Sequence, residues 1–315
     1  MDAKPRIEEL AERCYRRVSD QGLKHALAVQ SEAVRAMGEF LRSRGFVEIS
    51  PVILSPITDP LRHATGRAEV EYYGHRYQLT RSMIFHKQIA VLGHERIFAF
   101  SPNVRLEPVE LADTGRHLVE FTQLDLEVRG ATREDIITLG EELLVYTVSW
   151  VQERCAEALA FFGRRLRVPS HPFRRVSYRD AYDRYGTDFE VILSQQSEEP
   201  LWVVDMPLEA REFYDREDPA RPGTLVDMDL IYPEGFGEAL SGGEREHVPE
   251  RIVARMERSG LDPEDYRLYL EIARRGLYPS AGFGIGVERL TRFLCGLKRI
   301  EDAVLFPKVP GTLSL

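Results

Sequence analysis

The chain of 315 residues is poor in cysteine, in lysine and in long apolar stretches. It has no run of about 18 apolar residues, the length that a membrane-crossing helix needs. Its first ten residues, MDAKPRIEEL, are charged and do not resemble a secretory signal. The three cysteines, Cys14, Cys155 and Cys295, are widely spaced and odd in number, which argues against a disulfide framework and a cysteine metal site. We therefore expect a cytoplasmic protein with no membrane span.

Positive charge is also scarce, because the formal net charge is −9 and only five residues are lysine. Proteins whose main partner is a nucleic acid usually carry a basic excess, since neutralising phosphates supplies much of their affinity. The acidic balance therefore argues weakly against such a partner. A hydrophobic content of 43%, with no low-complexity segment, internal repeat or long linker, predicts one globular domain over residues 1–315.

Apolar residues recur with helical spacing in some segments and with strand character in others. The predicted helices lie at about 6–18, 27–41, 133–162, 247–259, 263–275 and 288–297. The predicted strands lie at about 46–51, 96–107, 118–129, 201–205, 225–231 and 281–287, with a hairpin at 68–80 that turns at Gly74-His75. Residues 170–223 give no pattern that orders their elements.

Residues 105–127, RLEPVELADTGRHLVEFTQLDLE, are the most informative segment. Because side chains alternate between the two faces of a strand, one face of its second strand is apolar and holds Leu124, Leu126 and Val128. The other face carries Phe121, Gln123, Asp125 and Glu127. Beside it lie Arg105 and Glu107 of the incoming strand and Arg116 and His117 of the loop. Such a surface suits a nucleoside triphosphate, although a solvent-facing hairpin would also be polar on one side.

This segment resembles motif 2 (about 103–128) of the class II aminoacyl-tRNA synthetases, and most closely their aspartyl/asparaginyl subgroup. The helix, strand and proline at about 29–53 resemble motif 1 of that family. The block 281–297, AGFGIGVERLTRFLCGL, resembles motif 3. A fourth block, FGEALSGGEREH (236–247), resembles the segment that binds metal and amino acid. The resemblance implies an α+β fold in which an antiparallel sheet is flanked by helices.

The resemblance also implies an ATP site with Mg²⁺. Arg105 would neutralise the α-phosphate, while Phe121 and Arg289 would cover the two faces of adenine. The implied ATP-binding residues are Arg105, Glu107, Arg116, His117, Phe121, Glu238 and Arg289. Asp229 and Glu238 would hold Mg²⁺, a cation that prefers carboxylate and phosphate oxygens. The implied catalytic residues are Arg105, Arg289 and Asp125.

The segment LTRSMIFHKQ (79–88) resembles the part of the family that selects the amino acid. Lys87 matches the lysine with which aspartyl enzymes hold the substrate carboxylate, and with Arg245 it gives two cations for one small anion. A surface lysine on a helix is the alternative. Ile84 departs from the family, because aspartyl enzymes usually have a glutamine there. The implied substrate-binding residues are Ser82, Lys87, Gln123, Asp125 and Arg245.

Aspartyl- and asparaginyl-tRNA synthetases carry an anticodon-binding barrel ahead of this core, and no segment of this sequence matches it. The segments SPITDPL (55–61) and FPKVPG (306–311) also match the archaeal asparagine synthetases that are related to asparaginyl-tRNA synthetase. This resemblance implies an AMP-forming aspartate–ammonia ligase that converts ATP, L-aspartate and ammonia into L-asparagine, AMP and pyrophosphate through a β-aspartyl-adenylate. It implies a homodimer built through motif 1, with no tRNA partner.

Two other functions stay open at this point. The chain could be a truncated synthetase that aminoacylates tRNA or another acceptor, or a catalytically silent regulatory paralogue that binds aspartate or a partner subunit. Within the first function, attack requires neutral ammonia and therefore a general base. Asp125 is a candidate for that base, but it could equally hold the ammonium group of the substrate.

Overall fold

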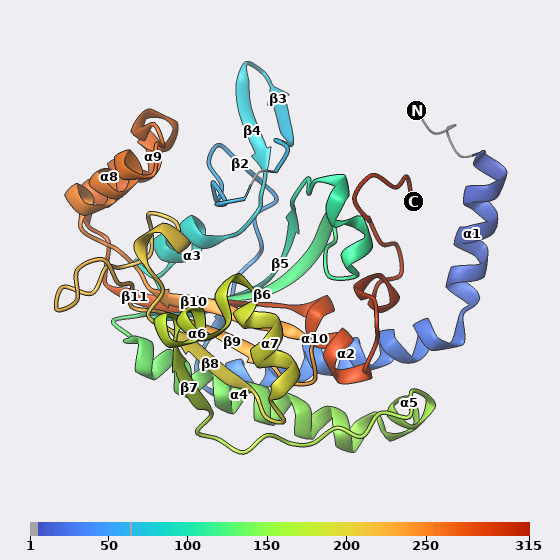
Figure 1. Ribbon diagram of the computed structural model, residues 1–315. Coiled ribbons are helices and arrows are strands. Elements are labelled where there is room, and N and C mark those ends of the chain that lie inside the picture. Colours follow the sequence, from blue (N-terminus) through green and yellow to red (C-terminus); the bar gives the residue numbers. More distant parts are fainter. Residues whose placement is uncertain (1–5, 64) are drawn as a thin grey trace.

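The structure is a computed structural model that describes residues 6–63 and 65–315. Its centre is an eight-stranded sheet in the order β1–β5–β6–β11–β10–β9–β8–β7 (Figure 1). The strands are β1 (Val47–Glu48), β5 (Arg96–Val104), β6 (Glu120–Arg129), β7 (Arg174–Ser177), β8 (Leu201–Val204), β9 (Asp227–Tyr232), β10 (Gly237–Glu244) and β11 (Ser280–Gly286). Neighbouring strands are antiparallel except at the two edges, where β1–β5 and β7–β8 are parallel. The predicted α+β class with an antiparallel sheet flanked by helices is confirmed.

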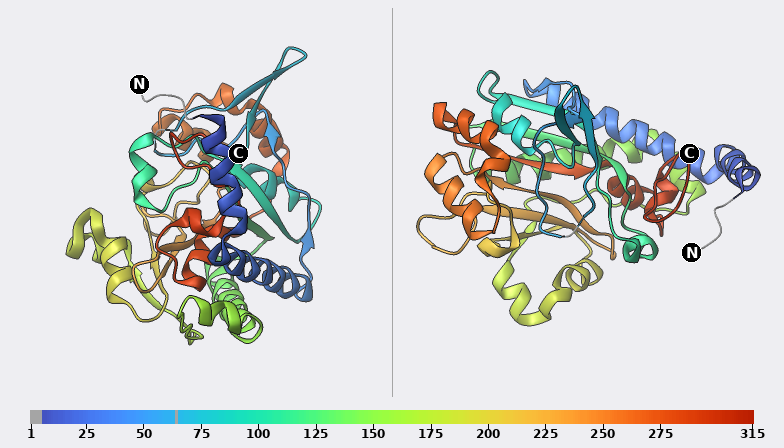
Figure 2. Two further views of the ribbon diagram at one scale, coloured as in Figure 1. Left: turned by 90° about the vertical axis from the view of Figure 1, so that its right-hand side faces the viewer. Right: turned by 90° about the horizontal axis from the view of Figure 1, so that it is seen from above.

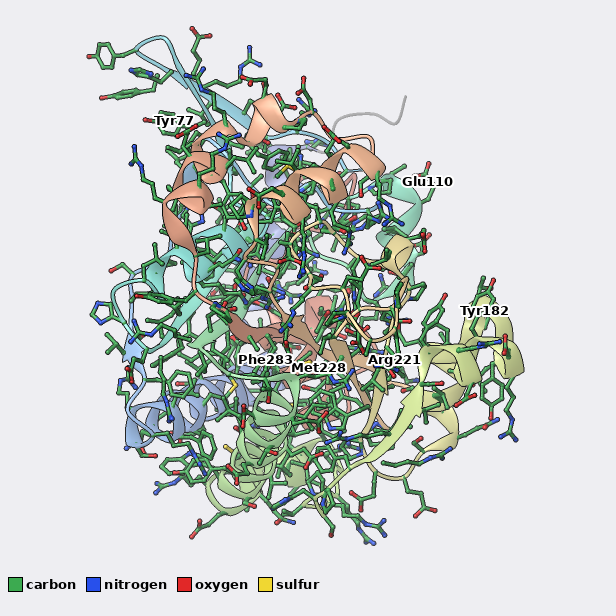
Figure 3. The ribbon with its side chains drawn as sticks, turned by 90° about the vertical axis from the view of Figure 1, so that its left-hand side faces the viewer. Tyr77, Glu110, Tyr182, Arg221, Met228 and Phe283 are labelled. Carbon is green, nitrogen blue, oxygen red and sulfur yellow. The ribbon has the colours of Figure 1, made fainter. Side chains whose placement is uncertain are left out.

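One face of this sheet is covered by helices α2 (Gln21–Ser43), α4 (Arg133–Arg154) and α10 (Val287–Cys295) (Figure 1). The alternation predicted for β6 is confirmed here, because Leu124 and Leu126 are fully buried in the core beneath the sheet. Figure 3 shows Met228 and Phe283, two further core residues, in the central part of the molecule. Burying this apolar face directs the polar face of β6 to the opposite side.

Helix α4 begins at a capping box in which Thr132 and Asp135 bond each other's backbone N–H groups. It ends at Cys155, and α5 (Ala156–Phe161) continues the predicted helical stretch after a break. Helix α2 ends before Gly45, whose φ of 78° is the left-handed conformation that terminates helices. Helix α1 (Ile7–Ser19) confirms the first predicted helix and lies at the margin of the molecule (Figure 2).

The other face of the sheet carries α3 (Ile84–Ala90), α8 (Pro249–Arg258), α9 (Arg267–Gly276) and a three-stranded sheet in the order β2–β4–β3. Strands β3 (Glu69–Tyr72) and β4 (His75–Leu79) form the predicted hairpin, which projects from the body and pairs with β2 (Leu54–Ser55) (Figures 1 and 2). The turn residues are Tyr73 and Gly74, one position earlier than predicted, because both adopt positive φ values.

Several predicted boundaries were wrong. The strand predicted at 46–51 is reduced to the two residues of β1, and β5 ends at Val104 rather than at residue 107. Strand β5 is shorter than predicted because its pairing with β6 stops after Val104, and Leu106 instead forms an isolated bridge with Gly66. Arg105 and Glu107 therefore lie beyond the strand. Strand β10, with α6 (Tyr178–Tyr185) and α7 (Phe189–Gln196), was not predicted.

None of the helices in residues 6–63 and 65–315 is long and apolar enough to cross a membrane.

Candidate active site

A cavity of about 560 Å³ lies against the sheet face opposite α2 and α4. Its floor includes Gln123 and Asp125 of β6 and Gly284 of β11, three residues that the antiparallel pairing of these strands brings side by side. The predicted site residues that line it are Ser82, Lys87, Arg105, Glu107, Arg116, His117, Phe121, Gln123, Asp125, Glu238, Arg245 and Arg289. Asp229 is the predicted site residue that does not line it. Four separate segments of the sequence thus meet at one cavity.

One end of the cavity is rich in arginine and contains an aromatic ring. The guanidinium of Arg105 lies 5.1 Å from the centroid of the Phe121 ring. Arg289, in the first turn of α10, lies 3.1 Å from Glu238 Oε1, and Arg116 Nη2 lies 2.5 Å from Glu190 Oε1. A planar cation beside an aromatic face suits a purine base, while several arginines suit the oxygens of phosphates.

His117 lines the cavity together with these arginines, and its protonation depends on what the cavity holds. Its Nδ1 lies 2.8 Å from the Thr114 hydroxyl. Burial lowers the pKa of His117, and the positive charges of Arg289 and Arg116 lower it further. These effects favour the neutral imidazole, although the negative charge of Glu107 opposes them. A polyphosphate beside it would favour the protonated form, because an opposite charge nearby raises the pKa of a histidine.

The other end of the cavity contains Lys87, which is buried with only 3% of its side chain exposed. Its Nζ donates to Asp125 Oδ1 at 2.9 Å and to the carbonyl oxygen of Phe283 at 3.2 Å. Glu127 Oε2 lies 3.9 Å away. Interpreting Lys87 as a surface lysine is therefore wrong. The carboxylates of Asp125 and Glu127 surround this buried lysine.

Arg245 completes this charged cluster from the end of β10. It donates through Nη1 to Asp215 Oδ1 at 2.9 Å, through Nε to Glu127 Oε1 at 3.2 Å and through Nη2 to the carbonyl oxygen of Gly282 at 2.8 Å. The side chains of Lys87 and Arg245 thus share Glu127. Glycine is needed at position 282 because an added Cβ would lie 2.1 Å from the carbonyl oxygen of Leu126.

The two predicted metal ligands lie on neighbouring strands, Asp229 on β9 and Glu238 on β10. Asp229 Oδ1 accepts from Arg211 Nη2 at 2.5 Å. Burial raises the pKa of Asp229 to about 6 in spite of that arginine. Burial also opposes ionisation of Glu238, but the positive charges of Arg289 and Arg211 hold the pKa of Glu238 below its ordinary value.

This donor set fits Mg²⁺ in part. Mg²⁺ is commonly bound by one or two carboxylates together with substrate phosphates and water. In the described part of the chain no group of three or more His, Cys, Asp or Glu residues could hold a metal ion. Asp229 and Glu238 would therefore need the oxygens of a bound nucleotide to complete the coordination, and Arg211 would have to release Asp229.

Sequence reasoning missed several charged residues of the cavity. The alternation of β6 placed Glu127 on the polar face with Asp125 but assigned it no role, and the structure shows it beside both Lys87 and Arg245. The lining residues Arg211, Glu212 and Asp215 come from the segment 170–223 that the sequence did not order. They follow a short 3-10 helix, Leu208–Ala210, in an irregular stretch. No helical or strand period marks that stretch, so no signal placed these residues near Lys87 or Arg245.

Comparison with known proteins places the chain in a family. Residues 7–310 match the family described as tRNA synthetases class II (D, K and N). The asparagine–tRNA ligase of Symbiobacterium thermophilum is 32% identical in an alignment of 313 positions that covers 91% of this chain and 70% of that protein. The asparagine–tRNA ligase of Pyrococcus abyssi is 31% identical, over 91% of this chain and 69% of that protein.

Solved structures agree with this assignment. The asparaginyl-tRNA synthetase of Pyrococcus horikoshii in complex with asparaginyl-adenylate matches with a TM-score of 0.89 and 29% identity, over 99% of this chain and 74% of that one. The aspartyl-tRNA synthetase of Entamoeba histolytica matches with a TM-score of 0.77 and 26% identity, over 92% of this chain and 59% of that one. The chain belongs to the class II tRNA synthetase (D, K and N) family and has its ATP-binding ligase core.

Proposed function

We propose that the chain is an ammonia-dependent asparagine synthetase. It would form β-aspartyl-adenylate from ATP and L-aspartate, and ammonia would then displace AMP to give L-asparagine. The observation that carries this proposal is the presence of two buried cations, Lys87 and Arg245, at one end of the cavity. A carboxylate is held best by charged donors, so these cations mark the end of the cavity that would bind a carboxylate of the substrate.

Both cations have donors available to a substrate. A lysine ammonium has three N–H donors, and Lys87 uses two of them within the described residues. The guanidinium of Arg245 has five N–H donors, and among the described residues four of them already donate to Glu127, Asp215 and the carbonyl oxygen of Gly282. One N–H of Nη1 is left for a substrate carboxylate. Because both side chains line the same cavity, one aspartate carboxylate would lie between them.

Asparagine is made only if the side-chain carboxylate of aspartate is activated. We infer that Lys87 and Arg245 hold the α-carboxylate, which leaves the β-carboxylate free to approach the arginine-rich end. This orientation is reversed relative to tRNA charging, which activates the α-carboxylate. Ile84, which lines the cavity, supports the reversal because it removes the amide that would hold the amino group in the usual orientation.

The arginine-rich end would bind ATP. Arg105 would neutralise the α-phosphate as negative charge builds in the transition state, and Arg116, His117 and Arg289 would hold the other phosphates. Phe121 would lie against the adenine ring. Mg²⁺, held by Asp229, Glu238 and the nucleotide, would neutralise charge on the departing pyrophosphate. Glu107 accepts from His63 Nε2 at 3.0 Å and would bind the base or the ribose.

A second function is transfer of an activated amino acid to tRNA, which differs in the carboxylate that is activated as well as in the acceptor. The relatives with 31–32% identity are asparagine–tRNA ligases, which favours transfer of an activated amino acid to tRNA. The net charge of −9 favours the small acceptor instead, because a protein that binds tRNA gains affinity from basic surface.

We also propose a homodimer through the motif 1 segment, in which the apolar residues Val47, Ile53 and Leu54 are exposed.

ATP–pyrophosphate exchange with different amino acids tests the substrate assignment. Aspartate should support exchange of labelled pyrophosphate into ATP, and asparagine at the same concentration should not. Succinate, which lacks the amino group, reports whether two carboxylates alone are enough. Exchange that depends on asparagine rather than aspartate would contradict activation of a β-carboxylate, because asparagine has none.

A further inference from the structure

Three carboxyl groups from two distant segments line the cavity close to the Lys87–Arg245 end. Asp59 belongs to the loop after β2, and Glu212 and Asp215 follow the 3-10 helix Leu208–Ala210. All three are buried, with 5%, 8% and 6% of their surface exposed respectively. None of them matches a residue to which the family resemblance gave a role. Their concentration in one buried place needs a physical explanation, because like charges in a low dielectric repel one another.

Two of the three carboxylates are satisfied within the protein. Asp59 Oδ2 accepts from the Tyr214 hydroxyl at 3.0 Å, and Asp59 Oδ1 accepts from the Leu61 backbone N–H at 3.0 Å. Asp215 Oδ1 accepts from Arg245 Nη1 at 2.9 Å. These bonds account for the ordered positions of Asp59 and Asp215.

Glu212 is different, because its Oε2 is buried and has no hydrogen-bond partner among the described residues. The nearest cation is Arg62, whose Nε lies 3.9 Å from Oε2, beyond hydrogen-bonding distance. The Glu212 side chain is 9% exposed. A buried acceptor without a partner loses its hydration with nothing in return, so such atoms are rare unless a ligand satisfies them.

The electrostatic surroundings of Glu212 point to a cationic ligand. Burial, with the negative charges of Asp59 and Asp215, raises the pKa of Glu212 to about 8, while Arg62 and Arg211 act in the opposite direction. The unliganded carboxyl is therefore mostly protonated at pH 7. A cation beside it would stabilise the ionised form and lower its pKa. Binding such a ligand would therefore release a proton at neutral pH.

We propose that Glu212, Asp215 and Asp59 form a subsite for a primary ammonium group, in which Glu212 Oε2 is the acceptor that awaits the ligand. An ammonium group supplies both the positive charge and the N–H donors that this carboxylate lacks. The inference rests on the proposed function for the identity of its ligand. Two sources have this chemistry, the free ammonium ion and the α-ammonium group of aspartate.

For free ammonium, the subsite would also supply the nucleophile. Glu212 as carboxylate takes one proton from NH₄⁺ and becomes the acid. The nitrogen lone pair of the resulting ammonia forms the C–N bond at the β-carbonyl carbon, and the C–O bond to AMP breaks with its electron pair leaving on AMP. The nitrogen then loses a second proton to solvent to give the neutral amide. For aspartate, the subsite would fix the amino group beside an α-carboxylate held by Arg245.

The Glu212→Gln variant tests the subsite, with Glu209→Gln as its matched control. Both changes replace a carboxylate by an amide three positions apart, but Glu209 is exposed and does not line the cavity. Glu212→Gln removes no hydrogen bond seen among the described residues, so it should fold. Both variants are compared with the wild-type protein in ATP–pyrophosphate exchange with varied aspartate and in asparagine formation with varied ammonium chloride.

If the subsite holds the α-ammonium group, Glu212→Gln raises the KM for aspartate in the exchange reaction by about tenfold or more. If it holds free ammonium, exchange is unchanged and the KM for ammonium chloride rises by a similar factor. If Glu212→Gln and Glu209→Gln have the same KM for aspartate and the same KM for ammonium chloride, the proposal is overturned. If the wild-type protein exchanges pyrophosphate but forms no asparagine, only the proposed function is refuted. The KM for aspartate of Glu212→Gln in the exchange reaction then decides whether the subsite exists.

Discussion

Lys87 Nζ lies 2.9 Å from Asp125 Oδ1, and this buried ion pair joins helix α3 to the central strand β6. The pair ties the segment 79–88 to the sheet that forms the floor of the cavity. Through Glu127, the same cluster continues to Arg245 and Asp215. One connected set of charges therefore joins α3, β6 and the end of β10 at the cavity where we propose that the substrate binds.

Lys87→Met should weaken aspartate binding much more than ATP binding. We expect the KM for aspartate in ATP–pyrophosphate exchange to rise by about tenfold or more, which corresponds to ~1.4 kcal/mol, with little change in the KM for ATP. The variant should also lose stability, by about 3–5 kcal/mol at most, because Asp125 is left buried without its cation.

Lys24→Met is the control for this change, since Lys24 is an exposed lysine on α2. It should leave both KM values and the denaturation midpoint close to those of the wild-type protein. Equal rises in the KM for aspartate and for ATP in Lys87→Met would indicate a general disturbance of the cavity and would count against a carboxylate contact.

Two glycines of β11 should respond differently to alanine. At Gly282 a Cβ would lie 2.1 Å from the Leu126 carbonyl oxygen, so Gly282→Ala must shift the sheet and should cost about 1–3 kcal/mol or more in unfolding free energy. At Gly284 a Cβ would lie 3.3 Å from Asp125 Oδ1 and from Gln123 Nε2, contacts that small movements relieve. Gly284→Ala should therefore fold well and reduce aspartate binding. Urea denaturation with exchange kinetics separates the two effects, and a Gly282→Ala protein of wild-type stability would contradict this packing.

Glu288 should make stability depend on pH. Burial raises the pKa of Glu288 to about 7 from an ordinary value of 4.5, and its carboxylate accepts from the Thr122 backbone N–H at 2.9 Å. Between these two pH values the folded state holds a proton that the unfolded state has lost. Stability from this group is therefore present below about pH 4.5 and is lost as the pH rises to about 7, by up to about 3 kcal/mol.

Glu288→Gln keeps an oxygen for Thr122 and removes this titration. The variant should gain stability relative to the wild-type protein between pH 5 and pH 7.5, as measured by urea denaturation at both pH values. A difference between the two proteins that does not change with pH would refute this assignment.

Ile53→Asp tests the proposed dimer. Ile53 is 54% exposed in the motif 1 segment, and a carboxylate there would have to be desolvated in an apolar interface. We expect the variant to be monomeric in light scattering coupled to size exclusion, while Leu268→Asp stays dimeric. Leu268 is 55% exposed on helix α9 and provides a matched control. A wild-type protein that is already monomeric would contradict the dimer.

Much of the architecture could be predicted because local patterns determine it. The alternation of Leu124 and Leu126 with Gln123 and Asp125 predicted both faces of β6, and Gly45 predicted the end of α2. Strand β10 was missed because its sequence, GEALSGGE, is rich in glycine and has little β propensity. It is a strand because it pairs with β9 and β11, and such tertiary pairing cannot be read from one segment.

Site residues that lie in the family motifs could be predicted from the sequence, whereas site residues outside those motifs could not. The motifs predicted that Arg105, Lys87 and Arg289 share one site, and in the structure all three line one cavity. The same reasoning gave no account of Glu212 or Asp215, because their positions follow from an irregular stretch held by long-range contacts. Arg255 is one such contact, since its Nη1 donates to the backbone carbonyl oxygen of Asp215 at 3.0 Å.

The most direct test of the central proposal is the product formed from ATP, Mg²⁺, L-aspartate and ammonium chloride in the absence of tRNA, resolved by chromatography. The account predicts L-asparagine and AMP in equal amounts, because ammonia displaces AMP from a β-adenylate. Isoasparagine would show that the α-carboxylate is activated and would contradict the reversed orientation. No amide, together with AMP release that depends on tRNA, would contradict the proposed function and establish tRNA as the acceptor.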